Sequence, residues 1–126
     1  MLKLEYTIRK DFTMDCIFCS IIKEAIPSTK IYEDDKCYAF LDIDPQAPVH
    51  CLVIPKLHIN SADEVNEENA EYISAIFTAI PKIANKLGLE KGYRIITNIG
   101  KHGAQTVKHL HFHILGGRQL SDHIVQ

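Results

Sequence analysis

The stretch His109-Leu110-His111-Phe112-His113-Ile114-Leu115 alternates histidine with apolar residues. A period of two predicts a β-strand, because successive side chains of a strand point to opposite faces of the sheet. The apolar residues would then lie on the core, and the other face would carry three imidazoles in a row: His109, His111 and His113. The alternative is three unrelated histidines, but so strict an alternation is hard to obtain from composition alone.

The composition is that of one globular domain. The chain has 126 residues, 46% of them hydrophobic, a net charge of −2 and a pI near 6.4. A nucleic-acid-binding surface is normally basic, so this balance argues against one. No apolar run is long enough to span a membrane, and Met1–Tyr6 does not resemble a secretory signal. We therefore expect a protein of the cytoplasm or the nucleus, with reduced cysteines.

Residues 1–13 are polar without an amphipathic period, and we expect them to form a flexible extension ahead of a domain over 14–126. Within that domain Asp15 would cap a short helix, and Asn66 would cap a long one that is followed by Gly88 as its C′ residue. Strands are expected in five segments that carry β-type patterns and turn signals at their ends: 30–33, 37–41, 49–54, 92–98 and the histidine segment.

Five strands with short connections and two helices predict an α+β domain built on a mainly antiparallel sheet. An open sheet of this size has edges that must be covered. The long helix also carries a wide apolar stripe, which suits packing against a second copy. We therefore expect a homodimer.

Three imidazoles on one strand face allow two kinds of chemistry. In the first, His111 is a nucleophile that attacks phosphorus from one ring nitrogen, while an acceptor holds the proton of the other. His113 would then donate to the reacting phosphate, and His109 would lie toward the supporting side. In the second, the histidines bind a catalytic metal, for which the His-x-His spacing is also suitable. The spacing alone does not choose between them.

The loop just upstream favours phosphate chemistry. Gly103, Gln105 and Thr106 bring a small residue, an amide and a hydroxyl next to the histidine segment. Small residues let backbone N–H groups approach an anion closely, and such donors stabilise charge on a transferred phosphoryl group. A short glycine loop by itself would more often be an ordinary turn, so the interpretation depends on the neighbouring histidines.

The histidine segment matches the His-φ-His-φ-His-φ-φ signature of the histidine triad (HIT) superfamily, where φ is apolar. Further matches resemble its Hint branch, the purine nucleoside phosphoramidases, and together they cover roughly residues 15–119. They are Cys16-Ile17-Phe18-Cys19, Phe40-Leu41-Asp42-Ile43, Pro45-Gln46-Ala47-Pro48-Val49-His50, Leu52-Val53-Ile54-Pro55-Lys56, Gly92-Tyr93-Arg94 and Leu115-Gly116-Gly117-Arg118-Gln119.

The resemblance implies the HIT fold, in which two five-stranded sheets join across a homodimer into one continuous ten-stranded sheet. It implies purine nucleotide ligands of the AMP or GMP type, and hydrolysis of the P–N bond of adenosine 5′-phosphoramidates through a nucleotidyl-histidine. No metal would be needed for that chemistry. The alternatives are a dinucleoside polyphosphate hydrolase of the same superfamily and a nucleotide-binding scaffold with little turnover. The tail after Gln119 lacks the tryptophan of animal Hint proteins, in which it helps to set substrate preference.

The resemblance also assigns roles to individual residues. His111 would be the nucleophile, with His109, His113 and the fourth histidine, His50, around it. Asp42 would bind the ribose hydroxyls. The phosphate and leaving group would be contacted by Asn98, Gly103, Gln105 and Thr106. The base would lie in an apolar slot near Ile17, Phe18, Ile21, Ile26 and Ile43, although core packing explains the residues of the first helix equally well from periodicity alone.

Cys16 and Cys19 open the first helix three residues apart, a spacing that lets two thiolates bind one zinc ion. Some members of the resembling family complete such a set with histidines at the positions of His58 and His109, both present here. Four protein ligands would make the zinc structural, because no coordination position stays open. A redox pair is the weaker alternative, since no βαβ pattern surrounds it. We interpret Cys37 and Cys51 as buried small residues.

Overall fold

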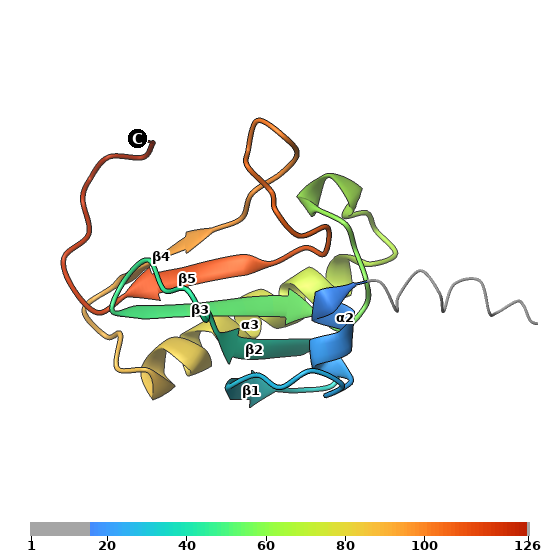
Figure 1. Cartoon of the computed structure of the whole chain (residues 1–126), viewed down its shortest axis with the longest axis horizontal. Coiled ribbons are helices and arrows are strands. Elements are labelled where there is room, and N and C mark those ends of the chain that lie inside the picture. Colours follow the sequence, from blue (N-terminus) through green and yellow to red (C-terminus); the bar gives the residue numbers. More distant parts are fainter. Residues whose placement is uncertain (1–15, 126) are drawn as a thin grey trace, which may run out of the picture.

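The computed structural model describes residues 16–125. Five strands form one sheet in the order β1-β2-β3-β5-β4, and every neighbouring pair is antiparallel (Figure 1). This confirms the expected α+β class. The predictions for residues 1–13, Met14 and Asp15 fall outside the described residues. The elements are α2 Ile17–Ile22, β1 Lys30–Glu33, β2 Cys37–Leu41, β3 Val49–Pro55, the 3-10 helix η1 Ala62–Glu64, α3 Ala70–Lys86, β4 Tyr93–Ile96 and β5 Phe112–Gly116.

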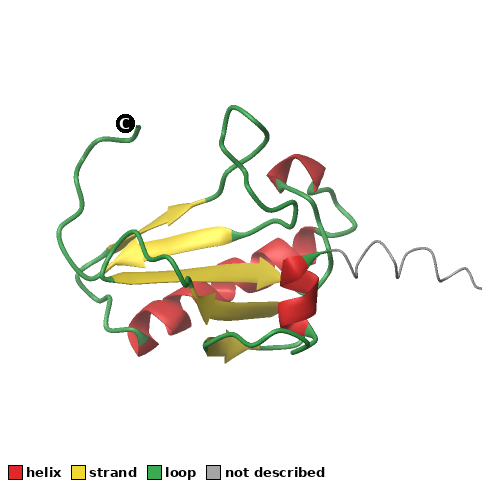
Figure 2. Cartoon of the chain, viewed as in Figure 1, coloured by secondary structure: helices red, strands yellow, loops and turns green. Residues whose placement is uncertain are grey.

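The sheet separates two apolar clusters, one on each face, and Figure 2 shows the helices that accompany them. On β2 the side chains alternate between the clusters: Cys37 and Ala39 pack on the α3 side, whereas Tyr38 and Phe40 pack on the α2 side. Cys37 and Cys51 are fully buried, as expected. Because α2 has only six residues, it is too short to be stable alone, and its position depends on what it packs against.

The long helix begins later than the sequence predicted. It starts at Ala70, and its N-cap is Asn69 rather than Asn66. The Asn66 side chain instead accepts hydrogen bonds from the backbone N–H groups of Glu68 and Asn69, at 2.8 and 3.0 Å. It therefore closes a local turn that competes with helical hydrogen bonding. The C-terminal prediction is confirmed, because Gly88 follows the helix with φ +73°.

The histidine segment has the predicted faces but a shorter strand. Leu110, Phe112 and Ile114 belong to the cluster beside α3, so the histidines face the other side of the sheet. However, β5 begins at Phe112, which pairs with Val53 on β3. Beyond that point β3 ends at Pro55, which has no N–H to continue the ladder. The predicted strand over 92–98 is likewise shorter, at Tyr93–Ile96.

The two edges of the sheet differ in chemistry. The β1 edge carries a charged group in which Glu33 is 2.9 Å from the Lys30 ammonium and 2.7 Å from that of Lys56. The β4 edge carries isoleucines instead, with Ile95 and Ile96 each 37% exposed. Among the described residues, no helix is long and apolar enough to cross a membrane.

Candidate active site and metal centre

His111 has one ring nitrogen fixed by the backbone and one left over. Its Nδ1 lies 2.7 Å from the His109 carbonyl oxygen. A carbonyl only accepts, so Nδ1 must carry the proton and donate it. In a neutral imidazole Nε2 then carries a lone pair. Burial of the ring lowers the pKa of His111, which keeps the imidazole neutral near pH 7. These are the properties required of a nucleophile.

His113 is oriented by a chain of hydrogen bonds that starts at a backbone amide. The Gln46 N–H donates to His50 Nδ1 at 3.0 Å, so the proton of a neutral His50 is on Nε2. That Nε2–H donates to His113 Nδ1 at 2.9 Å. A neutral His113 therefore carries its own proton on Nε2, as a donor. The ring centroids of His111 and His113 are 5.1 Å apart, so this donor lies beside the nucleophile.

Asp42 adds a carboxylate to this group. Its Oδ2 is 3.5 Å from His50 Nε2, and its Oδ1 accepts from the Asp44 N–H at 2.8 Å. Asp42, His50 and His113 lie close enough together to surround an ion. The Gln46 amide opposes that use, because it keeps a proton on the His50 nitrogen that would face the ion. His50 and His113 are therefore joined by a hydrogen bond, and the Asp42 carboxylate lies 3.5 Å from the His50 nitrogen that donates in it.

The loop before the histidine segment is braced by its own side chains. The Gln105 amide donates to the carbonyls of Asn60 and Val107 at 2.7 and 3.0 Å, and accepts from the Gly100 N–H. Asn98 donates to the Gly103 carbonyl at 2.7 Å. A Cβ on Gly103 would lie 2.3 Å from the Ile99 carbonyl oxygen, so the loop requires glycine there. Thr106 is exposed at the end of this loop.

The residues expected around a base divide into two sets. Phe18 and Ile21 are buried, and the Phe18 ring meets those of His111 and His109 edge-on at 5.2 and 5.9 Å. The others are exposed on the surface: Ile17 by 49%, Ile26 by 36% and Ile43 by 98%. Core packing therefore accounts for Phe18 and Ile21, and only the exposed residues have apolar surface left for a ligand.

The four predicted metal ligands come together in one cluster of two sulfurs and two imidazole nitrogens within 4.8 Å of one another. His109 Nδ1 is 3.3 Å from Cys16 Sγ and 3.6 Å from Cys19 Sγ, and His58 Nδ1 is 3.3 Å from Cys19 Sγ. Tetrahedral zinc bonds place sulfur and nitrogen ligands about 3.5 Å apart. The cluster therefore fits a tetrahedral zinc ion.

The outer nitrogens of the two cluster histidines are also engaged. His109 Nε2 donates to the Pro55 carbonyl at 2.9 Å, and His58 Nε2 donates to Asn60 Oδ1 at 2.8 Å. Both protons are thus held away from the sulfurs, which turns the two Nδ1 lone pairs toward the centre of the cluster. This is how protein oxygens orient histidine ligands around zinc. Burial raises the pKa of the Cys19 thiol to about 12, so metal binding must displace its proton.

Three contributors to these sites carried no distinct signal in the sequence. Asn60 connects His58 to Gln105, Gln46 acts through its backbone amide, and the Thr97 hydroxyl donates to the His111 carbonyl at 2.8 Å. A backbone donor leaves no mark on residue type. Asn60 lies in a predicted connection, where polar residues are ordinary, and Thr97 lies in the predicted strand 92–98, where threonine is common.

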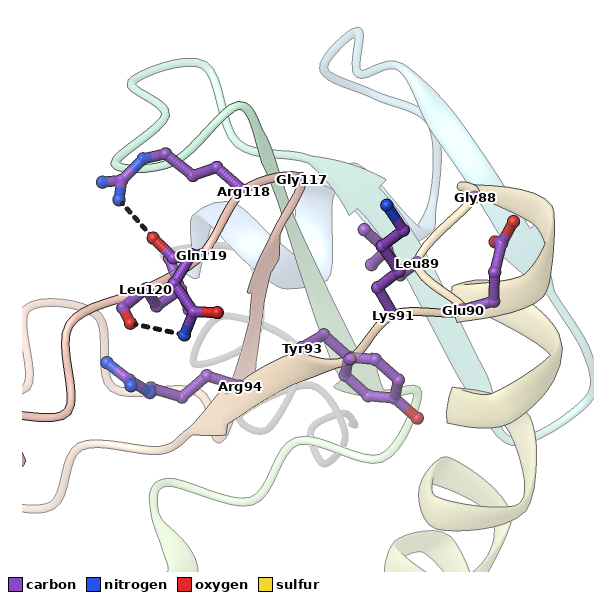
Figure 3. A pocket seen from close by; sticks show the side chains of 11 residues that line it. Gly88, Leu89, Glu90, Lys91, Tyr93, Arg94, Gly117, Arg118, Gln119 and Leu120 are labelled. Atoms are coloured by element: carbon purple, nitrogen blue, oxygen red, sulfur yellow. Dashed lines mark hydrogen bonds between the residues drawn. The ribbon is translucent and has the colours of Figure 1, made fainter.

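A separate pocket of about 730 Å³ lies at the opposite end of the sheet, where α3 leads into β4 and β5 leads into the tail (Figure 3). Arg94 and Arg118 extend along its rim, and Arg94 donates to the Ser121 carbonyl. None of the residues that line it belongs to the histidine site or to the metal cluster, so this pocket is not part of either site. Its walls are residues 88–94 and 117–120.

The profile of the HIT domain family matches residues 23–120 of the chain. The chain belongs to the HIT family. The similarity extends over almost the whole length of its relatives. An uncharacterised HIT-like protein of Synechococcus elongatus is 48% identical over 107 residues, which are 85% of this chain and 94% of that protein. A 14 kDa zinc-binding protein of Zea mays is 42% identical over 119 residues, 93% of each chain.

Solved structures show the same HIT fold. A HIT family hydrolase of Clostridium thermocellum has a TM-score of 0.85 at 51% identity, covering 88% of this chain and 97% of that one. A histidine triad nucleotide-binding protein of Candida albicans has a TM-score of 0.73 at 35% identity, covering 88% and 87%. The predicted HIT family is therefore confirmed. The name of the C. albicans protein, histidine triad nucleotide-binding protein, is the name used for the Hint branch.

Proposed function

We propose that this HIT protein hydrolyses the P–N bond of adenosine 5′-phosphoramidates to release AMP, with His111 as the nucleophile. The observation that carries the proposal is the 2.7 Å hydrogen bond from His111 Nδ1 to the His109 carbonyl, which leaves Nε2 unprotonated. The name of the C. thermocellum relative, a HIT family hydrolase, supports hydrolysis as the reaction class.

In the first step, His111 Nε2 attacks the α-phosphorus and the P–N bond breaks. The leaving amine keeps the bonding electrons and takes a proton from water, while His113 donates its Nε2–H as a hydrogen bond to a phosphoryl oxygen. His50 holds the other nitrogen of His113, so the donor tautomer is fixed before the substrate arrives. In the second step, water attacks the same phosphorus and releases a proton to the solvent, the N–P bond to His111 breaks, and AMP leaves.

The nucleotide would lie with its phosphate between His111, His113 and the loop that ends at Thr106. Gly103 and the braced backbone of this loop offer N–H donors for the phosphoryl charge. Asp42 would accept hydrogen bonds from the ribose hydroxyls at Oδ2, because its Oδ1 already accepts one from the Asp44 N–H. The base would meet the exposed apolar surface of Ile17, Ile26 and Ile43, together with the edge of α2.

The covalent intermediate provides the test. We expect a labelled adenosine phosphoramidate, quenched during turnover, to leave one nucleotidyl group per active chain, and peptide mapping to place it on His111. A label on another side chain, or none formed with a substrate that is being hydrolysed, would overturn the assignment. Faster cleavage of a diadenosine polyphosphate in a parallel assay would instead indicate the dinucleoside polyphosphate hydrolase.

We further propose that the cluster of Cys16, Cys19, His58 and His109 holds structural zinc. The distances within the cluster and the two outer hydrogen bonds support this, as does the name of the zinc-binding relative from maize. The ion would crosslink α2 to the segments that follow β3 and precede β5. Elemental analysis of the purified protein should find about one zinc per chain.

We also propose that two copies pair through their β4 strands to give a ten-stranded sheet. β4 is an end strand of the sheet, and Ile95 and Ile96 leave apolar surface beside its edge. Ile96→Lys should shift the protein from dimer to monomer in sedimentation equilibrium, whereas Lys30→Glu on the opposite edge should leave the dimer intact. A monomeric native protein would refute the pairing.

A further inference from the structure

We propose that the Cys/His cluster and the nucleotide site are energetically coupled, so that zinc in the cluster tightens binding of a purine nucleoside monophosphate and the nucleotide tightens zinc. The inference rests on the proposed function, because it requires both ligands to bind where that section places them. It adds that occupancy of the metal centre regulates the nucleotide site. Three separate connections between the sites carry the argument.

The first connection is His109 itself, which belongs to both sites. Its ring Nδ1 faces the sulfurs of Cys16 and Cys19, and its backbone carbonyl accepts the Nδ1 proton of His111. The His109 ring is fully buried and also held by the Pro55 carbonyl. A shift of this residue on loss of its metal bond would therefore move the acceptor that sets the tautomer and direction of the His111 ring.

The second connection runs through His58. Its Nε2 donates to the side chain of Asn60, whose backbone carbonyl accepts from the Gln105 amide at 2.7 Å. Gln105 in turn braces the loop that ends at Thr106 by two further backbone hydrogen bonds. Two hydrogen bonds, His58 to Asn60 and Asn60 to Gln105, therefore link a metal ligand to the phosphate-side loop.

The third connection is Phe18, which lies between the two cysteines on α2. Its ring meets the rings of His109 and His111 edge-on. Because α2 is too short to be stable alone, two metal–sulfur bonds at its start would hold the helix in place. They would thereby fix the contact between Phe18 and the ring of His111. Without an ion, the cluster is held only by the weak hydrogen bonds that thiols make to the two Nδ1 atoms.

Coupling of this kind is reciprocal by thermodynamic necessity. If zinc improves AMP affinity by some factor, AMP must improve zinc affinity by the same factor. Couplings between sites are typically about 5- to 150-fold. With one shared residue and two short paths we expect about tenfold.

The test compares the zinc-loaded full-length protein with the same protein depleted by a chelator. Calorimetric titration with AMP should give a dissociation constant about tenfold larger for the depleted form. Competition with a chromogenic chelator, with and without saturating AMP, should give the same factor for zinc. Cys51→Ala is the matched control, since it removes a buried thiol outside the cluster and should keep both values.

A second measurement removes the ambiguity that would arise if the depleted protein unfolded. Cobalt(II) in the cluster reports its ligand geometry through thiolate absorption bands. Saturating AMP should shift these bands in the folded, cobalt-loaded protein, and the shift should shrink in His111→Ala, which loses the bond to the His109 carbonyl. If the metal is only structural, the cobalt absorption bands should not change when AMP is added.

The outcomes separate the two proposals. Equal AMP affinities in folded loaded and depleted protein, or cobalt bands unchanged at saturating AMP, would overturn the coupling and leave the phosphoramidase proposal standing. Failure of the zinc-loaded protein to bind AMP at all would overturn both.

Discussion

His109 and His113 lie four residues apart on one segment, yet their rings face different surroundings. Both nitrogens of His109 are engaged within the protein, one toward the cysteine sulfurs and one by the Pro55 carbonyl. His113 has one nitrogen held by His50 and the other left for a ligand. His111, between them, resembles His113 in this respect. The roles proposed for these identical residues therefore differ with the number of ring nitrogens that the fold leaves open.

This difference explains why one short segment can serve two sites. A histidine engaged at both nitrogens is fixed in position and suits a structural ligand, whereas one open nitrogen with a fixed tautomer suits attack or donation. Each prediction below changes one side of the contrast and asks whether the other responds.

The largest effect is expected where an open nitrogen is removed. His111→Ala should lower phosphoramidate turnover by about 10³-fold or more, because it removes the nitrogen proposed to attack phosphorus. The variant should still fold and bind AMP, which steady-state kinetics and calorimetry would check. His102→Ala, which removes an exposed loop histidine, is the control and should keep turnover. Undiminished turnover in His111→Ala would refute its role as nucleophile.

Removal of a cluster ligand should act on stability first. Cys19→Ser should release zinc, and the free energy of unfolding should fall by about 4 kcal/mol in buffer holding zinc at about 1,000 times its Kd. Elemental analysis and urea unfolding would measure the two effects. Cys51→Ala, which also loses a buried thiol, should retain its metal. A Cys19→Ser protein with a full complement of zinc would disprove the ligand assignment.

The outer hydrogen bond of His58 allows a finer comparison. Asn60→Ala removes the acceptor of His58 Nε2 and should weaken zinc binding by about 10- to 100-fold. Asn60→Asp keeps an oxygen at the same place and should retain most of the affinity. Chelator competition would give both constants. Equal constants for the two variants would mean that this acceptor does not orient the ligand.

The smallest effect concerns pH. Burial, followed by the nearby rings of His111 and His50, lowers the pKa of His113 from 6.5 to about 4. Below pH 6.5 the unfolded chain binds a proton here that the folded protein refuses, so stability falls as pH drops toward 4. Urea titrations would measure the free energy of unfolding at pH about 7 and about 5. Its decrease over this range should be about 1 kcal/mol smaller for His113→Asn than for the native protein. If stability falls with pH equally in His113→Asn and the native protein, His113 is not the source of this pH dependence.

The alternation over 109–115 was sufficient to predict the two faces of the segment, because side-chain direction depends only on period. It could not predict where pairing stops, since that depends on the partner strand β3, which ends at Pro55. The helix start was wrong for a similar reason: Asn66 caps well in principle, but its side chain closes a turn of its own.

The candidate sites could likewise be predicted only in part from the sequence. Side chains with distinctive chemistry, such as Cys16 and His58, could be named from spacing and family resemblance, and the structure brings the metal set together. The orientation of His113 could not be foreseen, because it depends on the backbone amide of Gln46. The contact predicted between Gln105 and the ligand stays a prediction, and the spacing gave no sign that the same amide also braces the loop.

The unequal edges of the sheet limit how large an assembly can grow. Lys30, Glu33 and Lys56 place fixed charges along β1, which discourages another strand from adding there. If two copies pair through β4 as proposed, neither copy has a second apolar edge at which a further strand could add. Such pairing would stop at two copies, whereas apolar strands at both edges would let the sheet extend into a fibre.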